Sequence, residues 1–269
     1  MIIEFISTPG AGKTTMMRAA VQSLNARGYH AWAANDAARP VAARTLPGRA
    51  IAALPPRLQR PLLWQLFYAT AWMERARFNA RHRELVRGVQ VYQRRRPLAA
   101  ADRHHVMRWF NHHTGVYEFM RRRAGPTDVI LFDEGFTHRV VQLFASERDA
   151  PQVAAVGAYV ALLPRPDLLI HVAAPLDVCL ARVRARGVWP RFAAKGAADT
   201  ERFLAAAEQA VAVAVAAARD LGWMVVALDN GAADPAPAAA HLERALAAFA
   251  PTLPAAAAPG HSPQFVGGT

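Results

Sequence analysis

The stretch Ser7-Thr8-Pro9-Gly10-Ala11-Gly12-Lys13-Thr14-Thr15 decides the fold of this chain. It follows an apolar run, Ile2–Ile6, that is typical of a buried strand, and it leads directly into a helical pattern. Gly10 and Gly12 let the turn wrap closely, so that successive backbone N–H groups can point at one anion. A helix that begins at this turn adds the positive end of its dipole. The stretch therefore predicts a phosphate-binding loop.

Each side chain of this loop has an expected role. Lys13 would reach the outer phosphates as a point charge, and Thr14 would offer its hydroxyl to Mg²⁺. Ser7 stands where the strict motif has glycine, which leaves the chemistry-bearing positions intact. The predicted nucleotide-binding residues of the loop are Pro9, Gly10, Ala11, Gly12, Lys13, Thr14 and Thr15.

Composition narrows the class of protein. The chain has 269 residues and a formal net charge of +12, which suggests a polyanionic partner such as nucleic acid. Only Lys13 and Lys195 are lysines, however, so the positive charge reflects a general preference for arginine. The single cysteine, Cys179, excludes an intrachain disulfide and fits a reducing compartment. With no secretory signal and no long uninterrupted apolar segment, we expect a cytoplasmic protein without a membrane span.

Five strand-like runs alternate with helical patterns, which indicates a parallel sheet covered on both faces. The expected strands are Ile2–Ile6, Tyr29–Ala34, Asp128–Phe132, Leu168–Val172 and Trp223–Leu228. The first helix should run from Lys13 to Arg27 and end at Gly28. We therefore predict a three-layer α/β/α fold in one domain over residues 1–250, followed by a flexible tail over residues 251–269.

The interval between the second and third strands is too long for one crossover helix, so it predicts a helical subregion over about residues 55–124. Leu62, Leu66, Ala69 and Met73 recur there at helical spacing. Arginines also concentrate in this subregion, and Arg75 is the candidate among them for contacting an acceptor. The alternative is that these arginines are solvated helix faces.

Two carboxylates follow the third strand. Asp133 would hold Mg²⁺ at the carboxyl end of that strand, and Glu134 would lie at the mouth of the same crevice. After the fourth strand, Arg182 and Arg186 lie four residues apart on a predicted helix and should share a face. Two guanidinium groups there suit the charge of a transferring phosphoryl group, and residues 182–200 are expected to form a lid.

The chain resembles the phosphate-loop small-molecule kinases related to thymidylate and deoxynucleoside kinases. The resemblance covers roughly residues 1–250 and rests on the loop, on Phe132–Phe136 and on the segment from Pro175 to Gly187. It implies the P-loop NTPase fold with a Walker A loop, a lid over ATP that includes Arg182 and Arg186, and a turn near adenine that includes Asn230. The helical subregion would bind the phosphoryl acceptor.

One departure from that family bears on the acceptor. Thymidylate kinases have Asp-Arg where this chain has Asp133-Glu134, so an acceptor phosphate would lose an arginine contact. This favours a small-molecule hydroxyl that is polarised by a carboxylate, with Glu134 or Asp36 as the candidate base. Asp36 and Arg39 follow the second strand, on the side of the sheet where acceptors bind.

The prediction is an ATP- and Mg²⁺-dependent kinase that acts on a small-molecule acceptor, either nucleoside-like or another metabolite. The sequence does not fix the oligomeric state, and a homodimer is one assembly that it allows. Two alternatives remain open: an ATPase or GTPase switch, and a basic nucleic-acid-binding ATPase. His105 and His112 would lie about 10 Å apart along one helix, which is too far for one metal ion.

Overall fold

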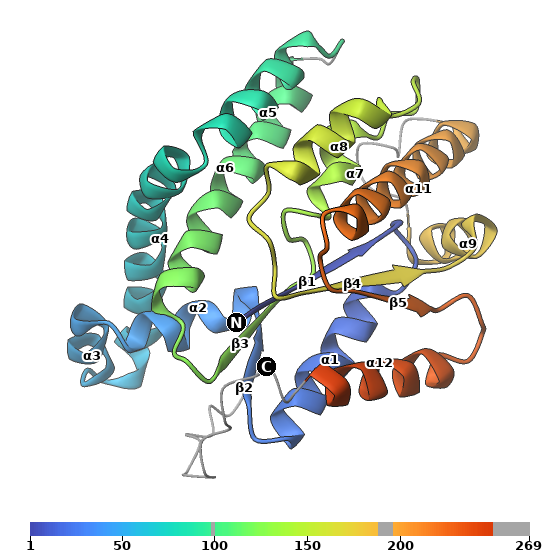
Figure 1. Cartoon of the computed structure of the whole chain (residues 1–269). Coiled ribbons are helices and arrows are strands. Elements are labelled where there is room, and N and C mark those ends of the chain that lie inside the picture. Colours follow the sequence, from blue (N-terminus) through green and yellow to red (C-terminus); the bar gives the residue numbers. More distant parts are fainter. Residues whose placement is uncertain (98–99, 188–195, 250–269) are drawn as a thin grey trace.

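Five parallel strands form one sheet in the order β2-β3-β1-β4-β5 (Figure 1). The computed structural model describes residues 1–269 except 98–99, 188–195 and 250–269. The strands are β1 (Ile2–Ser7), β2 (His30–Ala33), β3 (Asp128–Phe132), β4 (Leu168–Ala173) and β5 (Val225–Asp229). The predicted five-stranded parallel sheet is confirmed, and no strand boundary differs from the prediction by more than two residues.

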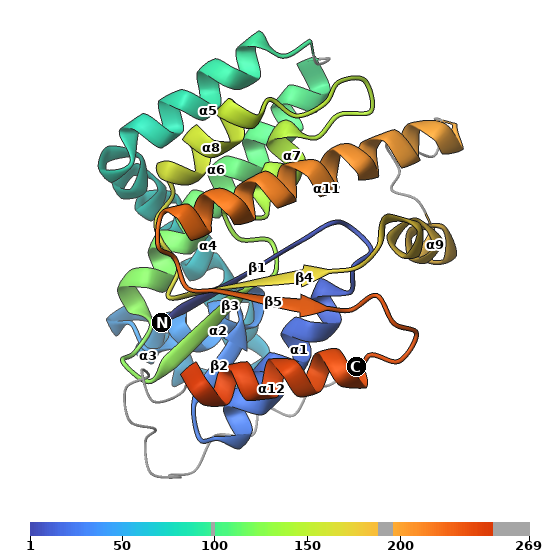
Figure 2. The same cartoon turned by 45° about the vertical axis from the view of Figure 1, so that its right-hand side comes forward.

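Helices cover both faces of the sheet, as the view in Figure 2 shows, and this confirms the predicted three-layer α/β/α arrangement. The face that carries α1 and α12 is opposite the face that carries most of the other helices. The helices are α1 (Lys13–Ala26), α2 (Ala34–Ala43), α3 (Leu46–Ala52), α4 (Pro56–Arg81), α5 (Arg83–Arg95), α6 (Ala100–Arg123), α7 (Arg139–Phe144), α8 (Val153–Ala161), α9 (Leu176–Arg186), α11 (Ala197–Asp220) and α12 (Ala236–Phe249).

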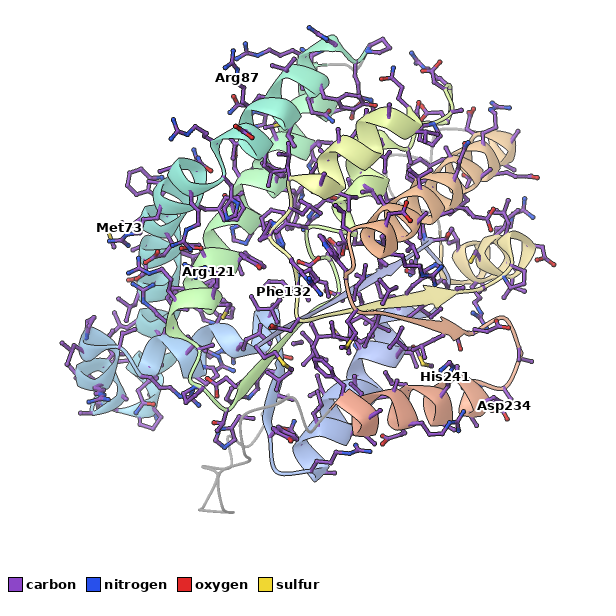
Figure 3. The ribbon with its side chains drawn as sticks, in the orientation of Figure 1. Met73, Arg87, Arg121, Phe132, Asp234 and His241 are labelled. Carbon is purple, nitrogen blue, oxygen red and sulfur yellow. The ribbon has the colours of Figure 1, made fainter. Side chains whose placement is uncertain are left out.

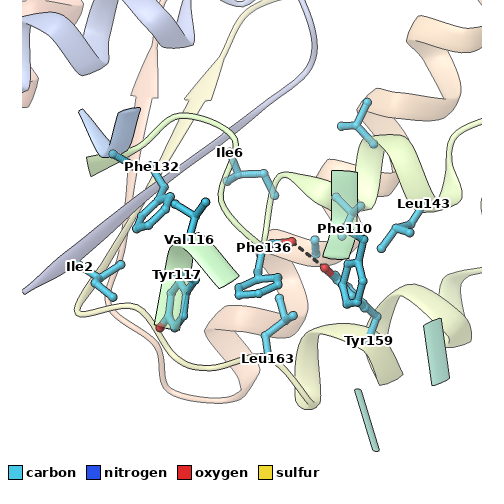
Figure 4. Packing of buried hydrophobic residues seen from close by; sticks show 14 of the residues in the cluster. Ile2, Ile6, Phe110, Val116, Tyr117, Phe132, Phe136, Leu143, Tyr159 and Leu163 are labelled. Atoms are coloured by element: carbon cyan, nitrogen blue, oxygen red, sulfur yellow. Dashed lines mark hydrogen bonds between the residues drawn. The ribbon is translucent and has the colours of Figure 1, made fainter. Parts of the chain in front are cut away.

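The alternation of side chains along β1 supplies two separate cores. Ile3 and Phe5 pack with α1 and α12 on one face, whereas Ile2 and Ile6 join the larger core on the other. Figure 4 shows part of this larger core, in which Phe136 is surrounded by aromatic and aliphatic side chains. All six residues of β1 are buried, including Glu4, which explains why apolar residues occupy both faces of this strand.

The helical region after β2 differs from the prediction in two ways. It begins at Ala34, because α2 and α3 precede the expected start near residue 55. On α4 the predicted periodicity identifies the helix but not its buried face. The buried face carries Leu63, Phe67 and Phe78, whereas Leu62, Leu66 and Met73 lie on other faces of the helix. The buried face also carries Glu74, and an acidic residue there conceals the apolar pattern.

Many arginines of this region pair with two buried carboxylates. Glu74 on α4 binds Arg77, Arg122 and Arg123 at 2.6 to 3.0 Å. Glu118 on α6 binds Arg121 at 2.6 Å, and Arg121 is labelled in Figure 3. These arginines therefore connect α4 and α6 or neutralise buried charge. The sequence had suggested either contact with an acceptor or solvated helix faces, and neither interpretation included this role.

Candidate active site

The phosphate loop connects β1 to α1 and depends on two glycines with left-handed backbone angles. Gly10 has φ +95° and Gly12 has φ +91°. A Cβ atom at Gly10 would lie 2.5 Å from the carbonyl oxygen of Cys179, so the loop packs directly against the backbone of α9. Cys179 itself is buried, and burial raises the pKa of its thiol to about 11, which fits a packing role.

The turn after β5 supports the loop from the other side. The side-chain amide of Asn230 donates to the carbonyl of Ala11 at 2.7 Å, and the Asn230 backbone N–H donates to Ala173 at 2.7 Å. Arg182 donates to the carbonyls of Asn230 and Ala232 at 2.9 and 3.1 Å. The structure thus places Arg182 and Asn230 together beside the loop, with the Arg182 guanidinium bonded to the turn.

Lys13 lies between the loop and the end of β3. Its ammonium group donates to the Asp133 carbonyl and lies 3.9 Å from the Asp133 carboxylate. Burial lowers the pKa of Lys13, opposed by the negative charges of Asp133 and Glu134, while the nearby guanidinium groups of Arg139 and Arg186 lower it further. Parallel pairing of β1 with β3 brings these groups to the same edge of the sheet.

A cavity of about 620 Å³ opens beside this contact, and we call it the loop cavity. It brings together four side chains that the sequence singled out: Thr14, Asp36, Asp133 and Glu134. Of the residues that the structure describes, those lining it do not include Arg39 or Arg75. The other residues lining it are Met17, Arg18, Val21, Gln22, Ala33, Ala34, Asn35, Trp109, His112, His113, Val116, Phe132 and Arg139.

Arg139, at the start of α7, is a site residue that the sequence interpretation missed. Its side chain is only 5% exposed and donates to Glu134 at 3.3 Å and to Gln142. Burial lowers the pKa of this guanidinium, and the charge of Glu134 opposes that shift. An arginine therefore does reach the carboxylate pair, from five residues beyond Glu134 instead of from the next position. No local motif marks it.

Glu4 was missed as well, although an acidic residue within an apolar strand is itself a signal. It lies in the middle of β1, where its carboxylate accepts hydrogen bonds from the backbone N–H groups of Phe136 and Thr137 at 3.1 and 2.9 Å. A Cβ atom at Gly135 would lie 2.7 Å from Glu4 Cγ, so glycine is needed for this approach. Burial raises the pKa of Glu4 against the opposing effect of these hydrogen bonds.

One face of α6 supplies the aromatic wall of the loop cavity. Trp109, His112, His113 and Val116 recur at three to four residues, a spacing that could have identified the face. His113 is buried with its ring against Phe132 and Phe136, and burial holds its pKa well below 6.5. Its Nε2 atom has no hydrogen-bond partner among the described residues.

Two oxygen donors in the loop cavity, Thr14 and Asp133, fit magnesium. Thr14 and Asp133 offer a hydroxyl and a carboxylate, which are hard oxygen ligands, and Mg²⁺ retains several waters when it is bound by few side chains. Within the described part of the chain, no group of three or more His, Cys, Asp or Glu side chains could hold a metal ion. None of the described helices has the length and hydropathy needed to cross a membrane.

No protein-family model matches the sequence, and no curated protein matches it. Among the solved structures that are similar to this chain, three are of deoxyadenosine kinase from M. mycoides, with bound dCTP, with bound dATP, and with the products dCMP and a flexible dCDP. They are 9%, 12% and 10% identical to this chain and cover 92%, 93% and 94% of it, with 100% of each of those chains covered. The TM-score is 0.42 in each case. The chain is thus similar to these kinases across most of its length, while its fold class rests on the sheet order and the loop described above.

Proposed function

We propose that the protein is a Mg²⁺- and ATP-dependent kinase that transfers the γ-phosphoryl group to a hydroxyl of a small molecule. The observation that carries the proposal is the contact of Lys13 with Asp133 at the edge of the loop cavity. It joins a phosphate-binding loop to a space that contains three carboxylates, those of Asp36, Asp133 and Glu134. A hydrolytic switch has no need of such a space.

The loop residues would bind the nucleotide. Backbone N–H groups from Pro9 to Thr15 and the Lys13 ammonium would contact the phosphates, while Thr14 and Asp133 would hold Mg²⁺. Bound ATP supplies the phosphoryl group. The charge of Arg186 contributes to the lowered pKa of Lys13, and we expect this guanidinium to help stabilise the charge that spreads over the transferring group. Arg182 would have to exchange its carbonyl contacts in order to do the same.

Two carboxylates can accept the proton of the acceptor hydroxyl. Glu134 is held by Arg139, which fixes the direction of its carboxylate, whereas Asp36 lies exposed in the first turn of α2. Both line the loop cavity. The aromatic wall and the buried His113 suit an acceptor with a flat or apolar body, such as a nucleoside, and the acceptor panel below therefore includes nucleosides.

The test is ADP release from ATP and Mg²⁺ with a panel of hydroxyl-bearing acceptors. We expect turnover only with particular acceptors, and we expect Lys13→Ala to abolish it. Glu134→Gln and Asp36→Asn identify the base when they are compared with Glu201→Gln, a change of an exposed carboxylate outside the loop cavity. Loss of the base should lower kcat by about 100-fold or more. Turnover that is independent of any acceptor would overturn the proposal in favour of an ATPase or GTPase.

A nucleic-acid-binding ATPase receives less support. Several of the arginines that suggested it are paired with Glu74 and Glu118. Steeply salt-dependent, saturable binding of an oligonucleotide would restore that alternative.

A further inference from the structure

A second cavity, of about 810 Å³, lies between α5 and α8, and we call it the α5–α8 cavity. Its volume is within the range of small-molecule sites, and its lining does not overlap that of the loop cavity. Both views of the molecule place α5 beside α8 at the end of the helical layer away from β2 (Figures 1 and 2). The residues lining it are Glu84, Leu85, Arg87, Gly88, Val89, Val91, Tyr92, Arg95, Arg96, Pro97, Phe144, Ser146, Asp149, Ala150, Gln152, Ala155, Ala158, Tyr159 and Leu162.

A glycine in the middle of α5 keeps this space open. Gly88 does not have a positive φ, and a Cβ atom added there would meet nothing within 4 Å. Neither backbone geometry nor close packing requires glycine at this position, although glycine in a helix costs roughly 0.5 to 1 kcal/mol relative to alanine. The absence of a side chain at Gly88 therefore leaves additional empty volume in the α5–α8 cavity.

The lining combines an apolar floor with a cationic rim. Leu85, Val89, Phe144 and Tyr159 are buried and form the floor. The rim carries five charged side chains, namely Arg87, Arg95, Arg96, Glu84 and Asp149.

The rim arginines differ in how they are engaged. Arg96 donates to the carbonyls of Leu143 and Ala145 at 2.6 and 3.2 Å. The side chains of Arg87 and Arg95 are exposed and have no ion-pair or hydrogen-bond partner within the described part of the chain. Arg87 is labelled on α5 in Figure 3. This combination suits a ligand with an apolar body and an anionic group.

Two residues of the floor are connected to the segment that carries the active-site carboxylates. The Tyr159 hydroxyl donates to the Phe136 carbonyl at 2.9 Å, as the dashed line in Figure 4 marks. Phe144 ends α7, and Arg139, which binds Glu134, begins it. A ligand that contacts Tyr159 and Phe144 would therefore act on both ends of residues 136–144.

We propose that the α5–α8 cavity is an effector site for a small anion with an apolar body, and that its occupancy changes the stability of the segment 133–139. The direct test of binding uses 8-anilinonaphthalene-1-sulfonate as the probe with nucleotide-free protein, so that it does not depend on the proposed kinase activity. We expect saturable binding at one site. Gly88→Leu, which places a branched side chain inside the cavity, should weaken binding at least 10-fold.

Matched variants separate this site from general surface binding. Gly157→Leu also adds a side chain in the middle of a helix where a Cβ meets nothing within 4 Å, but Gly157 does not line the cavity, and probe binding should stay unchanged. Arg87→Glu should weaken binding, and Arg94→Glu should not. Equal binding by the Gly88→Leu and Gly157→Leu variants, or binding that does not saturate, would overturn the proposed site.

Hydrogen exchange of a peptide that covers residues 133–139 tests the coupling. The probe should change its exchange rate at least 3-fold in the wild-type protein. Tyr159→Phe keeps the ring but removes the hydrogen bond to Phe136, so this variant should bind the probe while the exchange rate stays constant. Wild-type exchange that does not respond to saturating probe would overturn the coupling, whatever the result of the ADP-release assay.

Discussion

One carboxylate oxygen of Glu4 accepts both the backbone N–H and the hydroxyl of Thr137, at 2.9 and 2.6 Å. The two residues are 133 positions apart in the sequence, so the central strand fixes the segment that follows β3. Asp133 and Glu134 begin that segment, and Arg139 ends it. Glu4 therefore helps to position the segment that carries the site carboxylates, although it contacts neither Asp133 nor Glu134 by a hydrogen bond.

Replacing this carboxylate should weaken both the fold and the site. In Glu4→Gln, the amide NH₂ would face a hydrogen-bond donor of Phe136 or Thr137, leaving at least one buried donor unpaired. We expect a loss of roughly 2 kcal/mol in the free energy of unfolding, measured by urea denaturation. Glu201→Gln, an exposed change on α11, serves as the control. A Glu4→Gln variant as stable as the control would show that the Glu4 contacts do not fix the segment.

A second prediction concerns the glycine that lets Glu4 approach the segment. Gly135→Ala would place a Cβ against Glu4 Cδ and Cγ and should destabilise the protein by about 1 to 3 kcal/mol. Gly157→Ala adds the same atom on α8 into open space and should be neutral or stabilising by up to about 1 kcal/mol. Thermal unfolding of both variants tests this prediction. An equal change in stability in the two variants would contradict it.

The buried His113 predicts a pH dependence of stability. Burial, together with the charges of Arg139 and His112, holds its pKa well below 6.5 in the folded protein, so the unfolded chain binds the proton more readily. The stability contribution is present above about pH 6.5 and is lost as the pH falls below that value. His113→Phe keeps the aromatic packing and should reduce the drop in stability between pH 7.5 and pH 5.5. The control is His104→Phe, a change of an exposed histidine, which should leave the drop in stability unchanged when both variants are measured by urea denaturation. A drop in stability in His113→Phe as large as in the wild-type protein would refute the prediction.

Arg139 predicts a positioning effect on the reaction. Arg139→Gln removes the contact with Glu134 and leaves that carboxylate free to rotate, so kcat should fall about 10- to 100-fold while the KM for ATP changes little. Arg148→Gln, an exposed arginine beyond α7, is the matched control. A rise in the KM for ATP with unchanged kcat would instead place Arg139 in nucleotide binding.

The sequence predicts those parts of the molecule that depend on local pattern. The phosphate loop could be placed because glycine spacing, strand and helix all lie within a few consecutive residues from Ile2 to Thr15. Gly28 has a positive φ after α1, as expected from its position at the end of the helix. Asp133 could be placed because an acidic residue follows an apolar strand.

The rest depends on contacts between distant segments. Arg139 reaches Glu134 only because α7 turns back over the end of β3, and nothing in its neighbourhood in the sequence marks that turn. The buried face of α4 was misassigned because Glu74 replaces an apolar residue there and is neutralised by Arg122 and Arg123 from α6. The expected lid over residues 182–200 includes residues 188–195, which lie outside the described residues. The expected tail at 251–269 lies wholly outside them. Both stay predictions.

The most direct measurement follows the phosphoryl group itself. ATP labelled with ¹⁸O at the non-bridging γ-phosphate oxygens would be incubated with Mg²⁺, the protein and an acceptor that supports ADP release, and the products would be analysed by mass spectrometry. We predict a phosphate ester of the acceptor that keeps all the labelled oxygens, and no such product with Lys13→Ala. Labelled inorganic phosphate as the sole phosphorus product besides ADP would contradict the account.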